Sequence, residues 1–287
     1  MLTLENTELQ IELLDPVADA ARQGTRYCWG GYIWQVHDRT IGPLVSGPEW
    51  PEPKPTAFNG QGLPESFRHR SRDGRPLTWR GREGIAIGIG ALALDEAGNV
   101  VIAERCRWTH SVEDHRMVFQ TRHSAAGFEY SLERTIELDG RTIRSNTRFT
   151  SLGAQPFELQ WFAHPFFSLR AGKLQVGLRP GSTLPENPGF ALIDDQLSFK
   201  RSFVGTEDGQ FVLLKVPATE LLCASLDHPT LQNVEFETSF APDQCPIWGN
   251  GNTFSIEPYR ILNVRPSEPI AWCVQYHFGE RVLETRA

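Results

Sequence analysis

The sequence predicts an all-β protein, built as one large antiparallel domain of stacked sheets over residues 1–287. Apolar and polar residues alternate in most long segments, which is the period of a strand with one buried face. The chain has 25 glycines and 20 prolines, as expected where many turns join short strands. No unit repeats at a period of about 20–50 residues, which argues against a propeller or a solenoid.

The clearest strands belong to two predicted hairpins. Alternating residues run from 128 to 138, Asp139-Gly140 offers a two-residue turn at which φ can be positive, and residues 141–150 continue as a strand. A second hairpin is predicted to turn near residues 95–99. Near the end of the chain, residues 272–278 alternate again and predict another strand.

Helical signal is confined to residues 15–24, where Asp15 can act as N-cap and Gly24 as a stop. Residues 42–64 are rich in proline and glycine, but they also hold Trp and Phe side chains that are unusual in a linker. We therefore predict a long loop that packs on a sheet, of the kind that often carries a binding site. A second loop is predicted at residues 178–189.

Charge and composition exclude several classes of protein. With 28 basic and 35 acidic residues the net charge is −7, which gives no electrostatic reason to bind nucleic acid or an anionic membrane. No apolar run approaches the roughly 18 residues that a membrane span needs. The first residues are acidic where a secretory signal would be basic, and the five cysteines are scattered without a CxxC pair. We expect a cytoplasmic protein with reduced thiols.

His164 is the first candidate for chemistry. It precedes Pro165, which favours an extended backbone, and it has the opposite parity to Trp161, so it projects from the other face of the predicted strand. Phe166 and Phe167 could add to an aromatic wall beside it. The alternative is a histidine that is satisfied in or beside the core.

Glu257 is the second candidate. It lies between Ile256 and Pro258, where partial desolvation would raise the pKa of its carboxyl and suit it to general-base catalysis. On the predicted strand Ser255 points to the same side as Glu257. The alternative is an exposed glutamate paired with an arginine such as Arg260.

Together these segments resemble the aldose 1-epimerase (mutarotase) family. The carrying motifs are W-x-x-HPFF-x-L at residues 161–169 and F-x-I-EPY-R at residues 254–260, with a closing aromatic strand, WCVQYHF. Residues 24–36 are similar to the opening strand pair of that family. The resemblance implies a galactose mutarotase-like fold, a large antiparallel β supersandwich.

The resemblance also implies an activity, the interconversion of the α and β anomers of a sugar. Glu257 would take the proton of the C1 hydroxyl, and His164 would give a proton to the ring oxygen. No metal and no organic cofactor would be required. As an acid, His164 would have to be protonated at rest, which a nearby negative charge would favour.

Further contacts with the sugar are expected, but the sequence departs from the family pattern here. Family members usually have another histidine in the first third of the chain, and His69 is the candidate although the usual His-Gly context is missing. The alternative is that His69 belongs only to a solvated basic loop. The resemblance gives as substrate-binding candidates His69, Arg26, Glu65, Trp161 and Asp243. The cluster of Arg68, Arg70 and Arg72 leaves a sugar phosphate open as substrate.

Two functions thus remain open. The first is a mutarotase acting on a sugar or sugar phosphate. The second is a carbohydrate-binding or sensing protein on the same fold without turnover, which the missing His-Gly motif favours. A small-molecule sugar is the expected partner in both cases, with no nucleic acid and no membrane.

Overall fold

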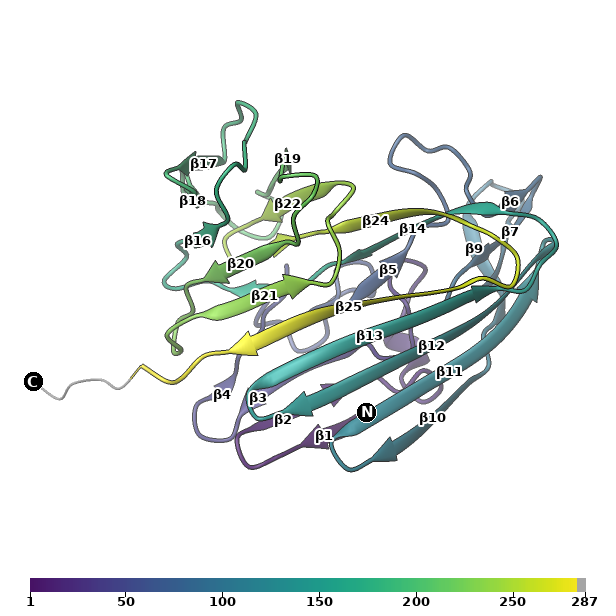
Figure 1. Ribbon diagram of the computed structural model, residues 1–287, viewed down its shortest axis with the longest axis horizontal. Coiled ribbons are helices and arrows are strands. Elements are labelled where there is room, and N and C mark those ends of the chain that lie inside the picture. Colours follow the sequence, from purple (N-terminus) through teal and green to yellow (C-terminus); the bar gives the residue numbers. More distant parts are fainter. Residues whose placement is uncertain (283–287) are drawn as a thin grey trace, which may run out of the picture.

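Most of the described chain, residues 1–282 of a computed structural model, is organised in antiparallel β-sheets (Figure 1). The largest sheet has ten strands, in the spatial order β10 (Trp108–Glu113), β11 (Arg116–Ala125), β12 (Phe128–Asp139), β13 (Thr142–Ser151), β25 (Pro269–Phe278), β21 (Val234–Thr238), β20 (Cys223–Leu226), β16 (Gln175–Leu178), β18 (Gln196–Phe199) and β17 (Phe190–Ile193). The prediction of an all-β fold is confirmed.

Four smaller sheets complete the arrangement. Their strands are β1 (Leu2–Glu5), β2 (Leu9–Leu13), β3 (Ile33–Asp38) and β4 (Gly42–Pro43); β6 (Trp79–Arg80), β7 (Glu83–Ala86), β8 (Gly90–Leu94) and β9 (Val100–Arg105); β15 (Phe167–Ser168), β23 (Thr253–Ile256), β22 (Cys245–Gly249) and β19 (Gln210–Leu214); and β24 (Tyr259–Val264), β14 (Phe157–Ala163) and β5 (Glu65–Phe67). In Figure 1, strands β1–β4 and β5 lie behind the large sheet. One continuous core of buried apolar side chains includes members of all five sheets.

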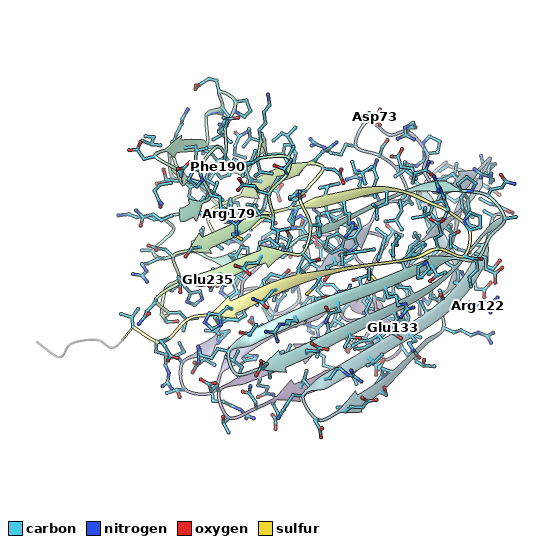
Figure 2. The ribbon with its side chains drawn as sticks, viewed as in Figure 1. Asp73, Arg122, Glu133, Arg179, Phe190 and Glu235 are labelled. Atoms are coloured by element: carbon cyan, nitrogen blue, oxygen red, sulfur yellow. The ribbon has the colours of Figure 1, made fainter. Side chains whose placement is uncertain are left out.

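The large sheet has one buried and one solvated face, as the alternation in the sequence predicts. Along β12 the side chains are alternately buried and partly exposed. Arg122 and Glu133, from β11 and β12, carry charge on the solvated face, and Figure 2 shows both on the same side of the molecule. Glu235 of β21, which the figure also labels, is exposed in the same way. This one-sided burial fixes the register of the sheet.

Both predicted hairpins are confirmed. Asp139 pairs with Thr142, so the loop consists of Gly140 and Arg141, one residue later than predicted. Gly140 has a φ of +53°, a conformation that glycine adopts without steric penalty. In the second hairpin Leu94 pairs with Val100, which leaves residues 95–99 as the turn.

The helix predicted at residues 15–24 is wrong. Asp15 does accept hydrogen bonds from the Val17 and Ala18 N–H groups, at 2.8 and 3.0 Å, as an N-cap would. Only a 3₁₀ turn, Ala20–Arg22, follows, because little more than Pro16 and Ala20 is buried there and this area is too small to stabilise further turns. Within residues 1–282 no helix is long and apolar enough to cross a membrane.

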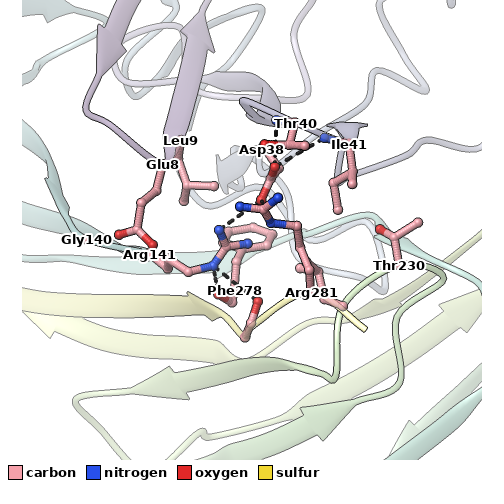
Figure 3. Close-up of polar contacts among 12 residues, drawn as sticks. Glu8, Leu9, Asp38, Thr40, Ile41, Gly140, Arg141, Thr230, Phe278 and Arg281 are labelled. Atoms are coloured by element: carbon pink, nitrogen blue, oxygen red, sulfur yellow. Dashed lines mark hydrogen bonds and ion pairs between the residues drawn. The ribbon is translucent and has the colours of Figure 1, made fainter. Parts of the chain in front are cut away.

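Asp38 and Arg141 form a buried ion pair that joins three parts of the chain (Figure 3). The Arg141 guanidinium is 2.9 Å from Asp38 Oδ2 and donates from Nε to the Phe278 carbonyl at 2.7 Å. The backbone N–H groups of Thr40 and Ile41 donate to the other carboxylate oxygen. The end of β3, the β12–β13 turn and the end of β25 are thereby held together.

Loss of the Asp38 charge should destabilise the protein strongly. Asp38→Asn leaves the Arg141 guanidinium buried without a counter-ion, and we expect the free energy of unfolding to fall by about 3–5 kcal/mol. Asp139→Asn is the control, because Asp139 lies 3.5 Å from Arg144 in an exposed pair, and it should change stability by less than about 1 kcal/mol. Urea unfolding measures both, and equal effects would contradict the role of the pair.

Candidate functional site

A cavity of about 610 Å³ is lined by residues of β5, β14, β19, β22 and β24 and of the loops beside them. The loop of residues 42–64 contributes Pro48, Phe58 and Asn59, in agreement with its prediction as a loop packed on the sheets. The charged and aromatic side chains that line the cavity are Arg26, Phe58, Arg68, His69, Arg70, Arg72, Phe162, His164, Phe166, Phe211, Trp248, Glu257 and Tyr259, with Phe67 at its inner end.

His164 enters the cavity at the end of β14. Its N–H donates to the Pro64 carbonyl at 2.8 Å, which continues the pairing of β14 with β5 by one more bond. The side chain is almost fully buried, and aromatic rings surround it: Phe166 lies 4.6 Å away and Tyr27 meets it edge-on at 5.8 Å. The ring nonetheless lines the cavity, so it is not sealed in the core.

Glu257 reaches the same place from the other side of the site. It follows β23, and its N–H donates to the Pro246 carbonyl at 2.8 Å. Its Oε1 lies 3.3 Å from Nε2 of His164. Two residues far apart in the sequence therefore meet in one cavity. Arg260, the alternative partner of Glu257, instead lies over the Phe240 ring at 5.2 Å.

Two further side chains hold the His164 ring. Arg26 approaches Nε2 with its Nη2 at 2.9 Å, and its Nη1 donates to the Phe58 carbonyl at 2.9 Å. Ser255 Oγ lies 3.0 Å from Nδ1. Arg26, one of the predicted substrate contacts, thus lines the cavity. The contact of Ser255 with the ring was not predicted, although the strand parity already put Ser255 on the side of Glu257.

Burial shifts both titratable groups away from charge. Burial, and then the Arg26 cation, hold the pKa of His164 well below its ordinary value. Burial raises the pKa of Glu257 to about 7, against the opposing effect of Arg26, Arg72 and Arg68. The expectation that His164 is protonated at rest is therefore not met, because a guanidinium contacts Nε2 and the adjacent carboxyl is itself hard to ionise.

Three further arginines give the cavity a positive rim. Arg68 donates to the Tyr259 hydroxyl at 3.2 Å, Arg70 lies 4.7 Å over the Trp79 ring, and Arg72 lies 4.4 Å over the Phe211 ring. Within residues 1–282, neither these three arginines nor Arg26 forms an ion pair with a carboxylate. Their charge is available to a ligand.

His69 lines the cavity as well. Its Nδ1 accepts a hydrogen bond from the Trp79 indole N–H at 3.0 Å. Burial, followed by the Arg70 and Arg68 charges, lowers the pKa of His69 to about 4, so the ring is neutral near pH 7. It can therefore offer a polar contact from Nε2.

Three predicted substrate contacts do not line the cavity. Glu65 is 2% exposed, and its carboxylate pairs with Arg134 at 2.6 Å and accepts from the Trp161 indole at 3.0 Å. The predictions of Glu65 and of Trp161 as substrate contacts need correction, because both side chains are buried in the core. Asp243 accepts from the Ile261 N–H at 2.6 Å, which fixes a loop outside the cavity.

Of the aromatic wall expected beside His164, Phe166 lines the cavity and Phe167 does not. The other aromatic side chains of the cavity were not predicted. Phe162 and Tyr259 are paired neighbours on β14 and β24, and their rings stack at 4.5 Å with an angle of 1°. Phe58 and Phe211 are large apolar side chains that are 68% and 41% exposed, both at the cavity. The alternation of apolar and polar residues identified strands, but where both faces of a strand are buried it could not show which face borders a cavity.

Solved structures share this fold at low sequence identity. A galactose mutarotase related enzyme from Lactobacillus acidophilus is 13% identical, with coverage of 98% of this chain and 99% of that chain and a TM-score of 0.61. A galactose mutarotase-like protein from Lactobacillus casei is 14% identical, with coverages of 96% and 99% and a TM-score of 0.59. A protein provisionally described as an aldose 1-epimerase from Escherichia coli is 15% identical, with coverages of 96% and 97% and a TM-score of 0.56.

These similarities define the class by fold. The chain has a galactose mutarotase-like fold, as the resemblance implied. No protein-family model and no curated protein matches the sequence.

The raised pKa of Glu257 predicts a pH dependence of stability. Between pH 4.5, its ordinary pKa, and about 7 the unfolded chain loses this proton while the folded protein keeps it. The free energy of unfolding of the wild type should therefore fall, relative to Glu257→Gln, as pH rises through that window, and the difference should level off above it. Urea unfolding across this pH range measures the effect.

The control is Glu158→Gln, which removes a carboxylate that pairs with Arg75 outside the cavity. This variant should keep the pH dependence of the wild type. Parallel curves for the wild type and Glu257→Gln would contradict a raised pKa at this site.

Proposed function

We propose that this protein is an aldose 1-epimerase-like mutarotase, an isomerase that interconverts the α and β anomers of a sugar or sugar phosphate. The observation that carries the proposal is the meeting of His164 and Glu257 at 3.3 Å in one open cavity. The mutarotase-like fold agrees with it.

The reaction requires two proton transfers. One group takes the proton of the C1 hydroxyl and another gives a proton to the ring oxygen, after which the aldehyde rotates and the ring closes from the other face. The resemblance assigns the base to Glu257 and the acid to His164. A carboxyl with a pKa of about 7 beside an imidazole is suited to proton exchange at neutral pH. Ring faces of Phe162, Phe166 and Tyr259 could pack on the apolar side of the sugar.

The finer part of the proposal is that the substrate carries an anionic group, as a sugar phosphate does. Four arginines that form no ion pair with a carboxylate of residues 1–282 line the cavity, in a protein whose net charge is −7. Guanidinium groups match phosphate oxygens with paired donors. Arg72 is the most exposed of them and lies over Phe211 at the edge of the cavity, where it could hold a phosphate remote from C1.

His164 and Glu257 form the central pair of the site, and removal of either side chain should abolish most of the activity. We expect Glu257→Gln and His164→Gln to lower kcat by about 10²–10⁴-fold, because each deletes one of the two proton-transfer groups. Anomer exchange measured by NMR on freshly dissolved hexoses and hexose phosphates tests this. Glu158→Gln should keep the wild-type rate. Full activity in Glu257→Gln would refute the proposal.

The anionic group predicts a selective effect of Arg72. Arg72→Met should raise KM for a hexose 6-phosphate by about 10–100-fold, the equivalent of one hydrogen bond to a charged group, and leave KM for the unphosphorylated hexose unchanged. Arg122→Met, on the solvated face of β11, is the matched control and should change neither constant. An equal rise in KM for both sugars would show that Arg72 does not bind a phosphate.

The non-catalytic alternative makes a different prediction. A carbohydrate-binding protein on this fold would bind sugar with unchanged affinity in Glu257→Gln and would show no anomer exchange in the wild type. Calorimetric titration of both proteins with the same sugar panel separates this alternative from the enzyme.

A further inference from the structure

Arg26 occupies the ring nitrogen of His164 that the proposed reaction needs. A guanidinium has only N–H donors, so Nε2 of His164 is the acceptor in its 2.9 Å contact with Arg26 Nη2 and carries no proton there. The other ring nitrogen, Nδ1, is not available to a sugar, because Ser255 Oγ lies 3.0 Å from it. As long as Arg26 stays in place, His164 has no proton to give to a ring oxygen.

The contacts that hold the Arg26 guanidinium are made by neutral groups. Besides the His164 ring, they are the Phe58 carbonyl at 2.9 Å, the Phe58 ring at 4.6 Å and the Tyr27 ring at 5.0 Å. No carboxylate of residues 1–282 forms an ion pair with Arg26. Hydrogen bonds to an ionised acceptor are roughly twice as strong as those between neutral groups. An anion that reaches Arg26 therefore competes effectively with its present partners.

An anion bound in the cavity would lie close to Arg26. Burial raises the pKa of Glu257 to about 7, and Arg26, Arg72 and Arg68 all act against it, so their three cations lie around the same carboxyl. Arg72 is exposed and reaches over the Phe211 ring, at the edge of the cavity. The three like charges repel one another in the free protein, and a dianion among them would be their common counter-ion.

The backbone around Arg26 is fixed, so a rotation of its side chain is the only movement required. Ser66 Oγ donates to the Arg26 carbonyl at 2.6 Å, which ties this residue to β5. The loop of residues 42–64 is closed on itself by the Asn59 side-chain amide, which donates to Glu49 at 2.5 Å. The Arg26 guanidinium can thus leave His164 while the rest of the site keeps its geometry.

We propose that Arg26 makes the site selective for sugars that carry an anionic group, because it releases Nε2 of His164 only when such a group draws its guanidinium away. This inference rests on the proposed function for the role of His164 as the acid. Once released, Nε2 takes a proton from water through the open cavity, gives it to the ring oxygen at ring opening and recovers it at ring closure. Arg26 exchanges no proton itself and is a positioning residue. Its charge is also the second cause, after burial, of the lowered pKa of His164.

A free dianion should replace the anionic group of the substrate. We expect sodium phosphite to raise kcat/KM of the wild type for an unphosphorylated hexose by about 5–150-fold, the range of coupling between two bound ligands. Anomer exchange is followed by NMR at constant pH, with sodium chloride keeping the ionic strength constant. The rate in the same solution without protein is subtracted, because such anions catalyse the exchange themselves. A rate that phosphite leaves unchanged would overturn the proposal.

Arg26→Met should make the release permanent. In this variant kcat/KM for the unphosphorylated hexose should exceed that of the wild type, and phosphite should no longer increase it. Arg22→Met is the matched control, because Arg22 lies over the Trp34 ring, outside the cavity, and it should respond to phosphite as the wild type does. Activation by phosphite in folded Arg26→Met, or loss of its hexose activity, would contradict the part assigned to Arg26.

Nitrogen NMR of the imidazoles reports the release without any sugar. We expect an unprotonated Nε2 for His164 in the wild type, assigned by its loss in His164→Gln, and a shift toward the protonated form when phosphite is added. His228, whose Nε2 lies 2.8 Å from the Leu44 carbonyl outside the cavity, should not respond.

This signal separates the failure of the inference from the failure of the proposed function. If the His164 signal responds to phosphite but no sugar is epimerised, the proposed function fails while the release by Arg26 stands. If sugars are epimerised but phosphite changes neither the signal nor the rate, the inference is refuted and the proposed function stands.

Discussion

The buried ion pair between Glu65 and Arg134 is the interaction on which the site depends. It joins β5, a strand of three residues, to β12, the third strand from one edge of the large sheet, with both side chains 1% exposed and 2.6 Å apart. Ser145 and Trp161 complete the hydrogen bonds of the carboxylate. A buried pair of this kind tolerates no loss of one partner, so it fixes the place of β5 rather than adding much net stability.

From β5, main-chain contacts position the functional side chains. The Pro64 carbonyl accepts from the His164 N–H, and the Glu65 carbonyl accepts from the Cys28 N–H. Ser66 Oγ donates to the Arg26 carbonyl at 2.6 Å. One short strand thus sets the histidine and the arginine that contacts it, while Glu257 arrives from β23. Glu65, which was predicted to contact the substrate, instead fixes the position of β5 through its ion pair with Arg134.

The sequence could predict the fold and the central pair, but it could not predict the contacts between them. Period-two alternation reports burial on one face, so β12, its hairpin and the large sheet were accessible. His164 and Glu257 stood out because each precedes a proline in an apolar segment. The Arg26–His164 contact and the inward turn of Glu65 arise from tertiary packing between distant strands, which leaves no local pattern. The helix at residues 15–24 failed because its local capping signal lacked a buried face.

Electrostatics couples the rim of the cavity to its centre. Arg26, Arg68 and Arg72 act to lower the pKa of Glu257, and burial acts against them with the larger effect. An anionic group bound among the arginines would cancel part of their charge and leave burial less opposed. The carboxyl would then hold its proton more firmly with substrate bound than without. An anionic group on the substrate would in this way help to keep the His164–Glu257 pair singly protonated, the state that the proposed reaction requires at both ring opening and ring closure, because each step takes one proton from the sugar and returns one to it.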